Sequence, residues 1–101
     1  MIAPFEHKGS LADVDESATT EMMALAKRAQ IALDAEYHPD GFNIGMNLGR
    51  SAGAGIADHL HLHVVPRWTG DANFVSVIGE TRVLPEDLPV TYDKLRRRFQ
   101  E

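Results

Sequence analysis

The 101-residue chain contains no cysteine and no long apolar run, and each absence excludes a class of protein. Without cysteine, the chain has no disulfide framework, no thiolate metal ligand and no thiol nucleophile. No stretch approaches the ~20 apolar residues of a membrane span, and the start lacks the basic and apolar regions of a secretion signal. We therefore expect a cytoplasmic protein without a membrane partner.

Basic residues are also scarce. The chain has 10 lysines and arginines against 15 aspartates and glutamates, which gives a formal net charge of -5. Without a broad positive surface it would not attract phosphate backbones, so we expect no nucleic-acid partner. A small phosphorylated ligand held by a few local donors is still allowed. The length and the 44% hydrophobic content predict one globular domain over residues 1–101.

The spacing of apolar side chains at three and four residues predicts one long helix over about 15–37. Asp15 is a suitable N-cap, and Asp13 is the alternative because Glu16 would then complete a capping box. Pro39 disfavours helical geometry in the residue before it, so the helix should end near His38.

An alternating pattern follows in two stretches, over 42–48 and about 58–67, which are separated by a glycine-rich loop over 49–55. Two alternating strands joined by one short loop most simply pair antiparallel. The remaining segments are predicted as a short buried strand over 1–5, a strand over 73–78, an extended connection over 82–89 and a helix over 91–100. The expected fold class is α+β, with an antiparallel sheet, one long helix and a C-terminal helix.

The second alternating stretch carries three of the five histidines at alternate positions, His59, His61 and His63. They share one face of the predicted strand, and antiparallel pairing would place Asn47 beside them. One interpretation is that the histidines form a solvated strand face or bond to polar neighbours.

A second interpretation is a metal site. At ~3.3 Å per residue, however, the three side chains are spread over about 13 Å, which is too far for one ion unless the strand bends.

Nucleophilic catalysis at phosphorus is the third interpretation of the triplet. A neutral imidazole is a good nucleophile near neutral pH, so His61 could attack while its two histidine neighbours donate to phosphate oxygens. The glycine-rich loop just upstream adds backbone N–H groups that can hold an anion.

The pattern His-φ-His-φ-His-φ-φ of the histidine triad (HIT) family, in which φ is apolar, matches residues 59–65 at every position. The segment Asn47-Leu48-Gly49 and the glycine-rich loop also occur where that family has them. The chain resembles the family from residue 1 to about residue 80. Residues 64–68 and 70–74 are more similar to the bacterial diadenosine tetraphosphate phosphorylase (ATP adenylyltransferase) branch than to the phosphoramidase branch.

The resemblance implies a nucleotidyl transferase or hydrolase acting on a nucleoside polyphosphate or phosphoramidate. His61 would attack the α-phosphorus and form a covalent nucleotidyl-histidine, which inorganic phosphate as co-substrate, or water, would release. His63 and Asn47 would hold phosphate oxygens, and His59 would help to orient the nucleophile. No metal and no other cofactor is required by this chemistry. The rival from another class is a catalytically weak nucleotide-binding protein.

The chain departs from many hydrolase members of the family in its loop. Those members carry a glutamine and a hydroxyl residue four and three positions before the first histidine, whereas this chain has Gly55 and Ile56. Backbone N–H groups, or Ser51, would then replace the side-chain donors. The candidate substrate-binding positions of the loop are Gly53, Ala54, Gly55 and Ile56.

Two more residues are candidates for substrate contact. His7 lies where some family members carry a leaving-group histidine, although a histidine in a charged turn is most often solvated. Trp68 would stack on a purine or cap the sheet. Family domains usually have further strands, which bind ribose and base, before the equivalent of Met1, so we expect a single HIT-like domain that lacks them. An unpartnered strand over 1–5 and a long apolar helix favour a homodimer.

Overall fold

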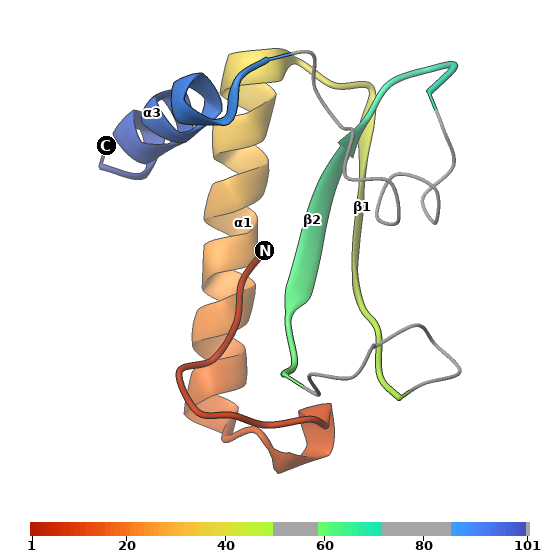
Figure 1. The fold of residues 1–101 in the computed structure, drawn as a ribbon, viewed down its shortest axis with the longest axis vertical. Helices are drawn as coiled ribbons and strands as arrows, with labels where there is room; N and C mark the ends of the chain where they lie inside the picture. Colours follow the sequence, from red (N-terminus) through yellow and green to blue (C-terminus); the bar gives the residue numbers. More distant parts are fainter. Residues whose placement is uncertain (50–58, 72–85, 101) are drawn as a thin grey trace. The chain divides into compact units, whose positions relative to one another are not determined.

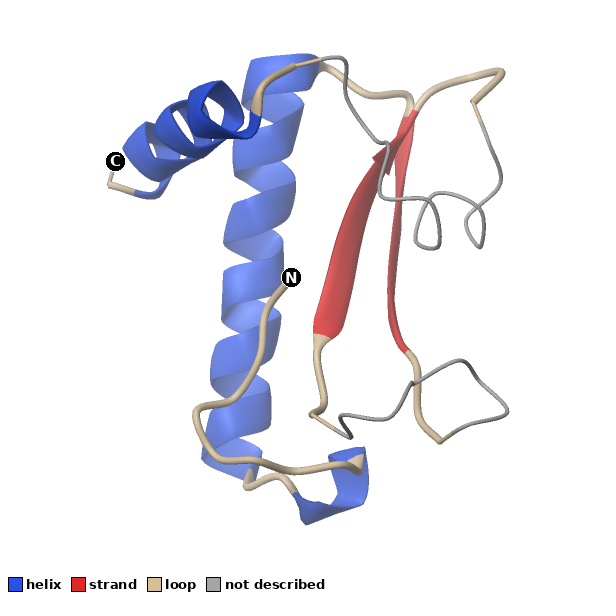
Figure 2. Ribbon diagram, in the orientation of Figure 1, coloured by secondary structure: helices blue, strands red, loops and turns tan. Residues whose placement is uncertain are grey.

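The computed structural model describes residues 1–49, 59–71 and 86–100. The described elements, in chain order, are η1 (Leu11–Asp13), α1 (Glu16–Tyr37), β1 (Gly41–Met46), β2 (Leu62–Arg67) and α3 (Leu88–Phe99) (Figure 1). β1 and β2 pair as an antiparallel two-stranded sheet, which Figure 2 shows in red. The α+β class is therefore confirmed. Within the described ranges, no helix is long and apolar enough to cross a membrane.

The bounds of α1 agree closely with the predicted helix. Asp15 directly precedes it, and its carbonyl accepts the N–H of Thr19 at 3.0 Å, so Asp15 occupies the N-cap position. The alternative cap was wrong, because Asp13 ends the 3-10 turn η1, which is capped by the Ser10 side chain. At the other end, His38 adopts a left-handed φ of 47° and the helix stops before Pro39.

The chain forms two compact units, Met1–Lys27 with Ile44–Val64, and Arg28–Asn43 with Val65–Glu101. In the first unit, Met22 and Ala26 of α1 form a buried cluster with Leu62 of β2. Ile2, Met46 and Val64 pack against this cluster. The alternation predicted for this stretch is therefore confirmed at positions 62 and 64, whose apolar side chains belong to the cluster or pack against it. Burial of this face fixes which way the intervening His63 points.

β2 begins at Leu62, so the predicted start near 58 was wrong. The physical reason is the pairing of the preceding residues: Leu60 N–H donates to the Lys8 carbonyl at 2.8 Å, and Leu62 N–H donates to the Ile2 carbonyl at 2.7 Å. Residues 60–62 thus bond to the N-terminal segment. This tie brings residues more than fifty positions apart in the sequence into one site.

The predicted buried strand over residues 1–5 was also wrong. The segment forms one isolated antiparallel bridge, Ile2 to Leu62, and Met1 and Phe5 are exposed. Alternation explains the pattern, because the side chain of Ile2 turns towards the buried cluster and those of its neighbours turn away from it.

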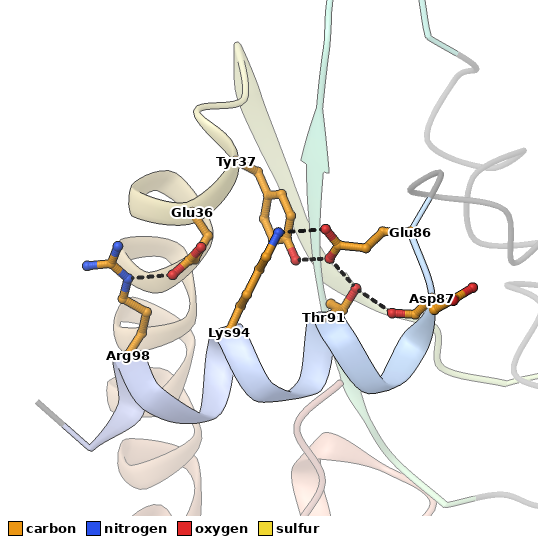
Figure 3. Close-up of polar contacts among 7 residues, drawn as sticks. All are labelled: Glu36, Tyr37, Glu86, Asp87, Thr91, Lys94 and Arg98. Atoms are coloured by element: carbon orange, nitrogen blue, oxygen red, sulfur yellow. Dashed lines mark hydrogen bonds and ion pairs between the residues drawn. The ribbon is translucent and has the colours of Figure 1, made fainter.

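In the second unit, α3 bonds to the C-terminal turns of α1 through the polar side chains in Figure 3. Glu86 accepts hydrogen bonds from the Tyr37 hydroxyl, the Thr91 hydroxyl and the Lys94 ammonium, each at 2.7 Å, and Arg98 pairs with Glu36 at 2.9 Å.

α3 begins three residues before the predicted start of the C-terminal helix. The extended connection was thus wrong for residues 88 and 89, because Pro89 occupies the first helical turn, where a proline needs no N–H partner. The rest of that connection up to residue 85, the predicted strand over 73–78 and the predicted loop from residue 50 on lie outside the described residues.

Candidate active site

The three histidines lie at the start of β2 in the first unit. His63 belongs to the strand and is buried, with 7% of its surface exposed, while His59 and His61 precede the strand and are half-buried. The His61 and His63 rings meet edge to face, with their centroids 4.5 Å apart. The predicted sharing of one face thus brings His61 and His63 into contact.

The hydrogen bond of His61 determines which of its nitrogens can react. Its Nδ1 lies 3.1 Å from the backbone carbonyl of His59. A carbonyl oxygen only accepts, so Nδ1 must carry the proton. In the neutral ring, Nε2 then holds the free lone pair. No residue that the structure describes bonds to Nε2 of His61.

His63 differs from His61 in its electrostatics. Burial, followed by the charge of the protonated His61 ring, lowers the pKa of His63 below its usual 6.5. The His63 imidazole is therefore neutral near pH 7. A neutral imidazole retains one N–H, which can donate to an oxygen without bringing a buried charge into the site.

His59 contacts a residue that lies far away in the sequence. Its Nε2 lies 3.1 Å from the carbonyl of Pro4, and its Nδ1 lies 3.2 Å from Nδ1 of His7. The two rings stand edge to face, with centroids 5.1 Å apart. His7 is exposed but also bonded, so solvation alone does not describe it. The Pro4 carbonyl is a partner that sequence reasoning missed, because no side-chain type marks a backbone acceptor.

The structure describes two of the other candidates, Asn47 and Trp68. Asn47 follows β1 in the first unit and is half-buried, and its contact with the triad stays a prediction. Trp68 belongs to the second unit, in a turn where Asp71 accepts the Trp68 N–H at 3.0 Å and both Nε and Nη2 of Arg67. Four loop candidates lie outside the described residues: Gly53, Ala54, Gly55 and Ile56.

The described ranges contain no group of three histidine, aspartate or glutamate side chains placed to hold one metal ion. His59 and His61 each direct one ring nitrogen to a backbone carbonyl, so that nitrogen carries a proton and has no lone pair for a metal ion. What the arrangement offers is one imidazole with a free lone pair beside a second, neutral imidazole.

An α+β fold with a histidine triad at the start of strand β2 defines the class of this protein. The model of the HIT domain family matches residues 1–70. The chain belongs to the histidine triad (HIT) family, and the predicted resemblance is confirmed.

Two curated relatives illustrate the range of similarity. The chain is 44% identical over 86 residues to a Mycobacterium tuberculosis protein named AP-4-A phosphorylase, a match that covers 85% of this chain and 44% of that protein. It is 27% identical over 75 residues to an uncharacterized HIT-like protein of Saccharolobus solfataricus, covering 74% of this chain and 53% of that one. The chain thus spans about half the length of these relatives.

Solved structures give the same family. A hypothetical histidine triad nucleotide-binding protein of Sulfolobus tokodaii superposes with a TM-score of 0.66 at 26% identity, covering 95% of this chain and 62% of that one. A zinc-bound histidine triad family protein of Mycobacterium smegmatis superposes with a TM-score of 0.61 at 29% identity, covering 93% and 60%.

Proposed function

We propose that this chain transfers a nucleotidyl group from a dinucleoside polyphosphate of the diadenosine tetraphosphate type to inorganic phosphate, with His61 as the nucleophile. The observation that carries the proposal is the bond from His61 Nδ1 to the His59 carbonyl, which leaves the lone pair on Nε2. The 44% identity to a relative named AP-4-A phosphorylase supports this substrate class.

The first chemical step joins His61 to the substrate. The Nε2 lone pair attacks the α-phosphorus, a P–N bond forms, and the bond from that phosphorus to the bridging oxygen breaks. The departing nucleoside triphosphate takes the electron pair. The ring of His61 becomes positively charged, and the His59 carbonyl stabilises this charge because it already accepts the Nδ1 proton at 3.1 Å.

The second step releases the nucleotide. An oxygen of inorganic phosphate attacks the same phosphorus, the P–N bond breaks, and the electron pair returns to Nε2 of His61. Diadenosine tetraphosphate and phosphate thus give ATP and ADP, and the ring is regenerated. With water in place of phosphate, the product would be AMP, which is the hydrolase alternative within the same family.

The neighbours of His61 would stabilise the charge that develops on the phosphate. His63 touches the His61 ring, and its neutral state near pH 7 leaves one N–H to donate to a non-bridging oxygen. We assign the same role to the Asn47 amide and to the backbone N–H groups of residues 53–56. We assign Trp68 to the purine base. The scheme uses no metal ion and no organic cofactor.

The experiment traps the covalent intermediate. The chain is incubated with diadenosine tetraphosphate labelled at the α-phosphorus, without phosphate, and the protein is tested for an acid-labile, base-stable label. Phosphate is then added, and the products are separated. We expect a label that is chased into ADP, at an unchanged rate after EDTA treatment. Release as AMP alone would select the hydrolase, and absence of any label and of any turnover would remove the enzymatic proposal for this chain.

A further inference from the structure

The contact between His7 and His59 is not used by the scheme above, although it joins two of the chain's five histidines. The two Nδ1 atoms face each other at 3.2 Å. Two N–H groups cannot point at each other over this distance, and two lone pairs would repel, so one proton lies between the rings.

The Pro4 carbonyl decides which ring supplies that proton. Because this carbonyl only accepts, Nε2 of His59 carries a hydrogen. In the neutral His59 ring, Nδ1 is then a bare acceptor, and Nδ1 of His7 must be the donor. The His59 ring is thus held from both sides, by the Pro4 carbonyl at 3.1 Å and by the His7 N–H at 3.2 Å.

We propose that His7 is a positioning residue for the nucleophile and acts through His59. Its N–H, together with the Pro4 carbonyl, fixes the His59 side chain, and the His59 backbone carbonyl in turn holds the proton on Nδ1 of His61. The effect on the reaction rests on the proposed function of His61. The effect on the tautomer of His61 does not.

The local backbone explains why a hydrogen bond on the His59 ring matters to its carbonyl. Residues 59–61 precede β2, so no strand pairing with β1 holds the His59 carbonyl. The nearest backbone tie is the bond from Leu60 N–H to the Lys8 carbonyl, which anchors the same peptide group whose oxygen bonds His61. His7 lies beside Lys8, so one short segment fixes both the ring and the peptide group of His59.

The tautomer of His61 decides its reactivity. If its Nδ1 proton moves to Nε2, the lone pair that faces the substrate is lost and the ring cannot attack until it changes tautomer. A neutral imidazole without a fixed acceptor populates both tautomers. Loosening the His59 carbonyl therefore removes part of the reactive population of His61.

Two variants separate the hydrogen bond from the size of the side chain. The first, His7→Asn, keeps an N–H donor near the position of Nδ1, while His7→Leu has a similar size and no donor. The control is His38→Asn, because His38 lies at the end of α1 in the second unit, and asparagine tolerates its left-handed backbone. Imidazole nitrogen NMR of the full chain gives the tautomer of His61, and the labelling reaction gives its rate.

We expect wild type, His7→Asn and His38→Asn to show His61 with its proton on Nδ1. His7→Leu should show a mixture of tautomers and label about tenfold more slowly, since small misplacements near reacting atoms cost one to two powers of ten. If wild type carries its His61 proton on Nε2, the proposal is overturned whether or not His7→Leu folds. An unchanged His61 tautomer in folded His7→Leu overturns it as well, and a slower rate with that unchanged tautomer means that His7 contacts substrate directly.

A mixture of His61 tautomers in His7→Asn also contradicts the role assigned to the N–H of His7. If no variant and no wild-type protein is labelled, but the tautomers change as expected, then the positioning role holds and the nucleotidyl-transfer proposal fails. The two proposals are thus tested separately.

Discussion

Polar side chains gather around the histidines in the first unit and around Glu86 in the second, and the two clusters use their hydrogen-bonding groups differently. In the second, both carboxylate oxygens of Glu86 accept bonds, from the Tyr37 and Thr91 hydroxyls and from the Lys94 ammonium. In the first, the bond to His61 leaves Nε2 of that ring unbonded by any described residue. A reaction needs such an unused lone pair.

The largest pKa shifts lie in the second unit and not among the histidines. Lys94, Thr91 and Tyr37 lower the pKa of Glu86 to about 2, and the Arg67 fork lowers the pKa of Asp71 to about 2. Both groups lie in the second unit, where Glu86 joins the end of α1 to α3 and Asp71 closes the turn that follows β2. A strongly shifted pKa is a common sign of a functional site, but ion pairs that hold a fold together produce the same shift. In this chain, the bonding of each ring nitrogen identifies the site better than the size of a shift.

The largest expected effect comes from replacing the nucleophile. His61→Gln keeps a polar side chain but removes the imidazole lone pair, so labelling by diadenosine tetraphosphate should fall by about 10³-fold or more. The matched control is His38→Asn, which removes an imidazole from the second unit and should label like wild type. Equal labelling of His61→Gln and wild type would refute the assignment of the reactive nitrogen to the first cluster.

A smaller effect should appear in the acid sensitivity of the first unit. Burial lowers the pKa of His63 below the value of 6.5 that it has when unfolded, so the unfolded chain takes up this proton first as the pH falls. The free energy of unfolding should therefore decrease as the pH falls below 6.5. Above that pH both states hold His63 neutral, and His63 causes no such destabilisation. Urea denaturation at a series of pH values measures it. In His63→Gln, the free energy of unfolding should depend less on pH below 6.5. An identical pH dependence in both proteins would contradict the assignment of this effect to His63.

The sequence predicted the elements whose signals are local. The bounds of α1 follow from apolar spacing and from Pro39, and the triad follows from alternate positions within seven residues. The start of β2 and the partner of His59 could not be predicted in this way. Both depend on the pairing of residues 2–8 with 60–62, and nothing in either segment alone identifies the other.

The error at α3 has a different origin. Residues 82–89 contain two prolines and were expected to form an extended connection, but a proline within the first turn fits a helix. The sequence could not predict which ring nitrogen of His61 holds the lone pair, because the position of the proton depends on the His59 carbonyl 3.1 Å from Nδ1. Residue type indicates which chemistry is available, and the backbone around it determines which atom performs it.

The smallest expected effect concerns the second cluster. Glu86→Gln removes the charge that Lys94 pairs with, and the stability that depends on this carboxylate is lost in wild type as the pH falls from 4.5 towards 2. The pair lies near the surface, where water and salt weaken it, so the decrease in the unfolding midpoint should be slight and should shrink at high salt. Labelling of His61 should not change.

The same variant has a direct spectroscopic readout. Burial, and then the hydrogen bond to Glu86, raises the pKa of Tyr37 above 10.0. Removing the carboxylate should lower this pKa partway, because the burial remains. The chain has two tyrosines, so absorbance titration in a Tyr92→Phe background reports on Tyr37 alone. If Glu86→Gln shifts this titration and also slows labelling, then the second cluster acts on the histidines and the separation between a structural and a reactive cluster fails.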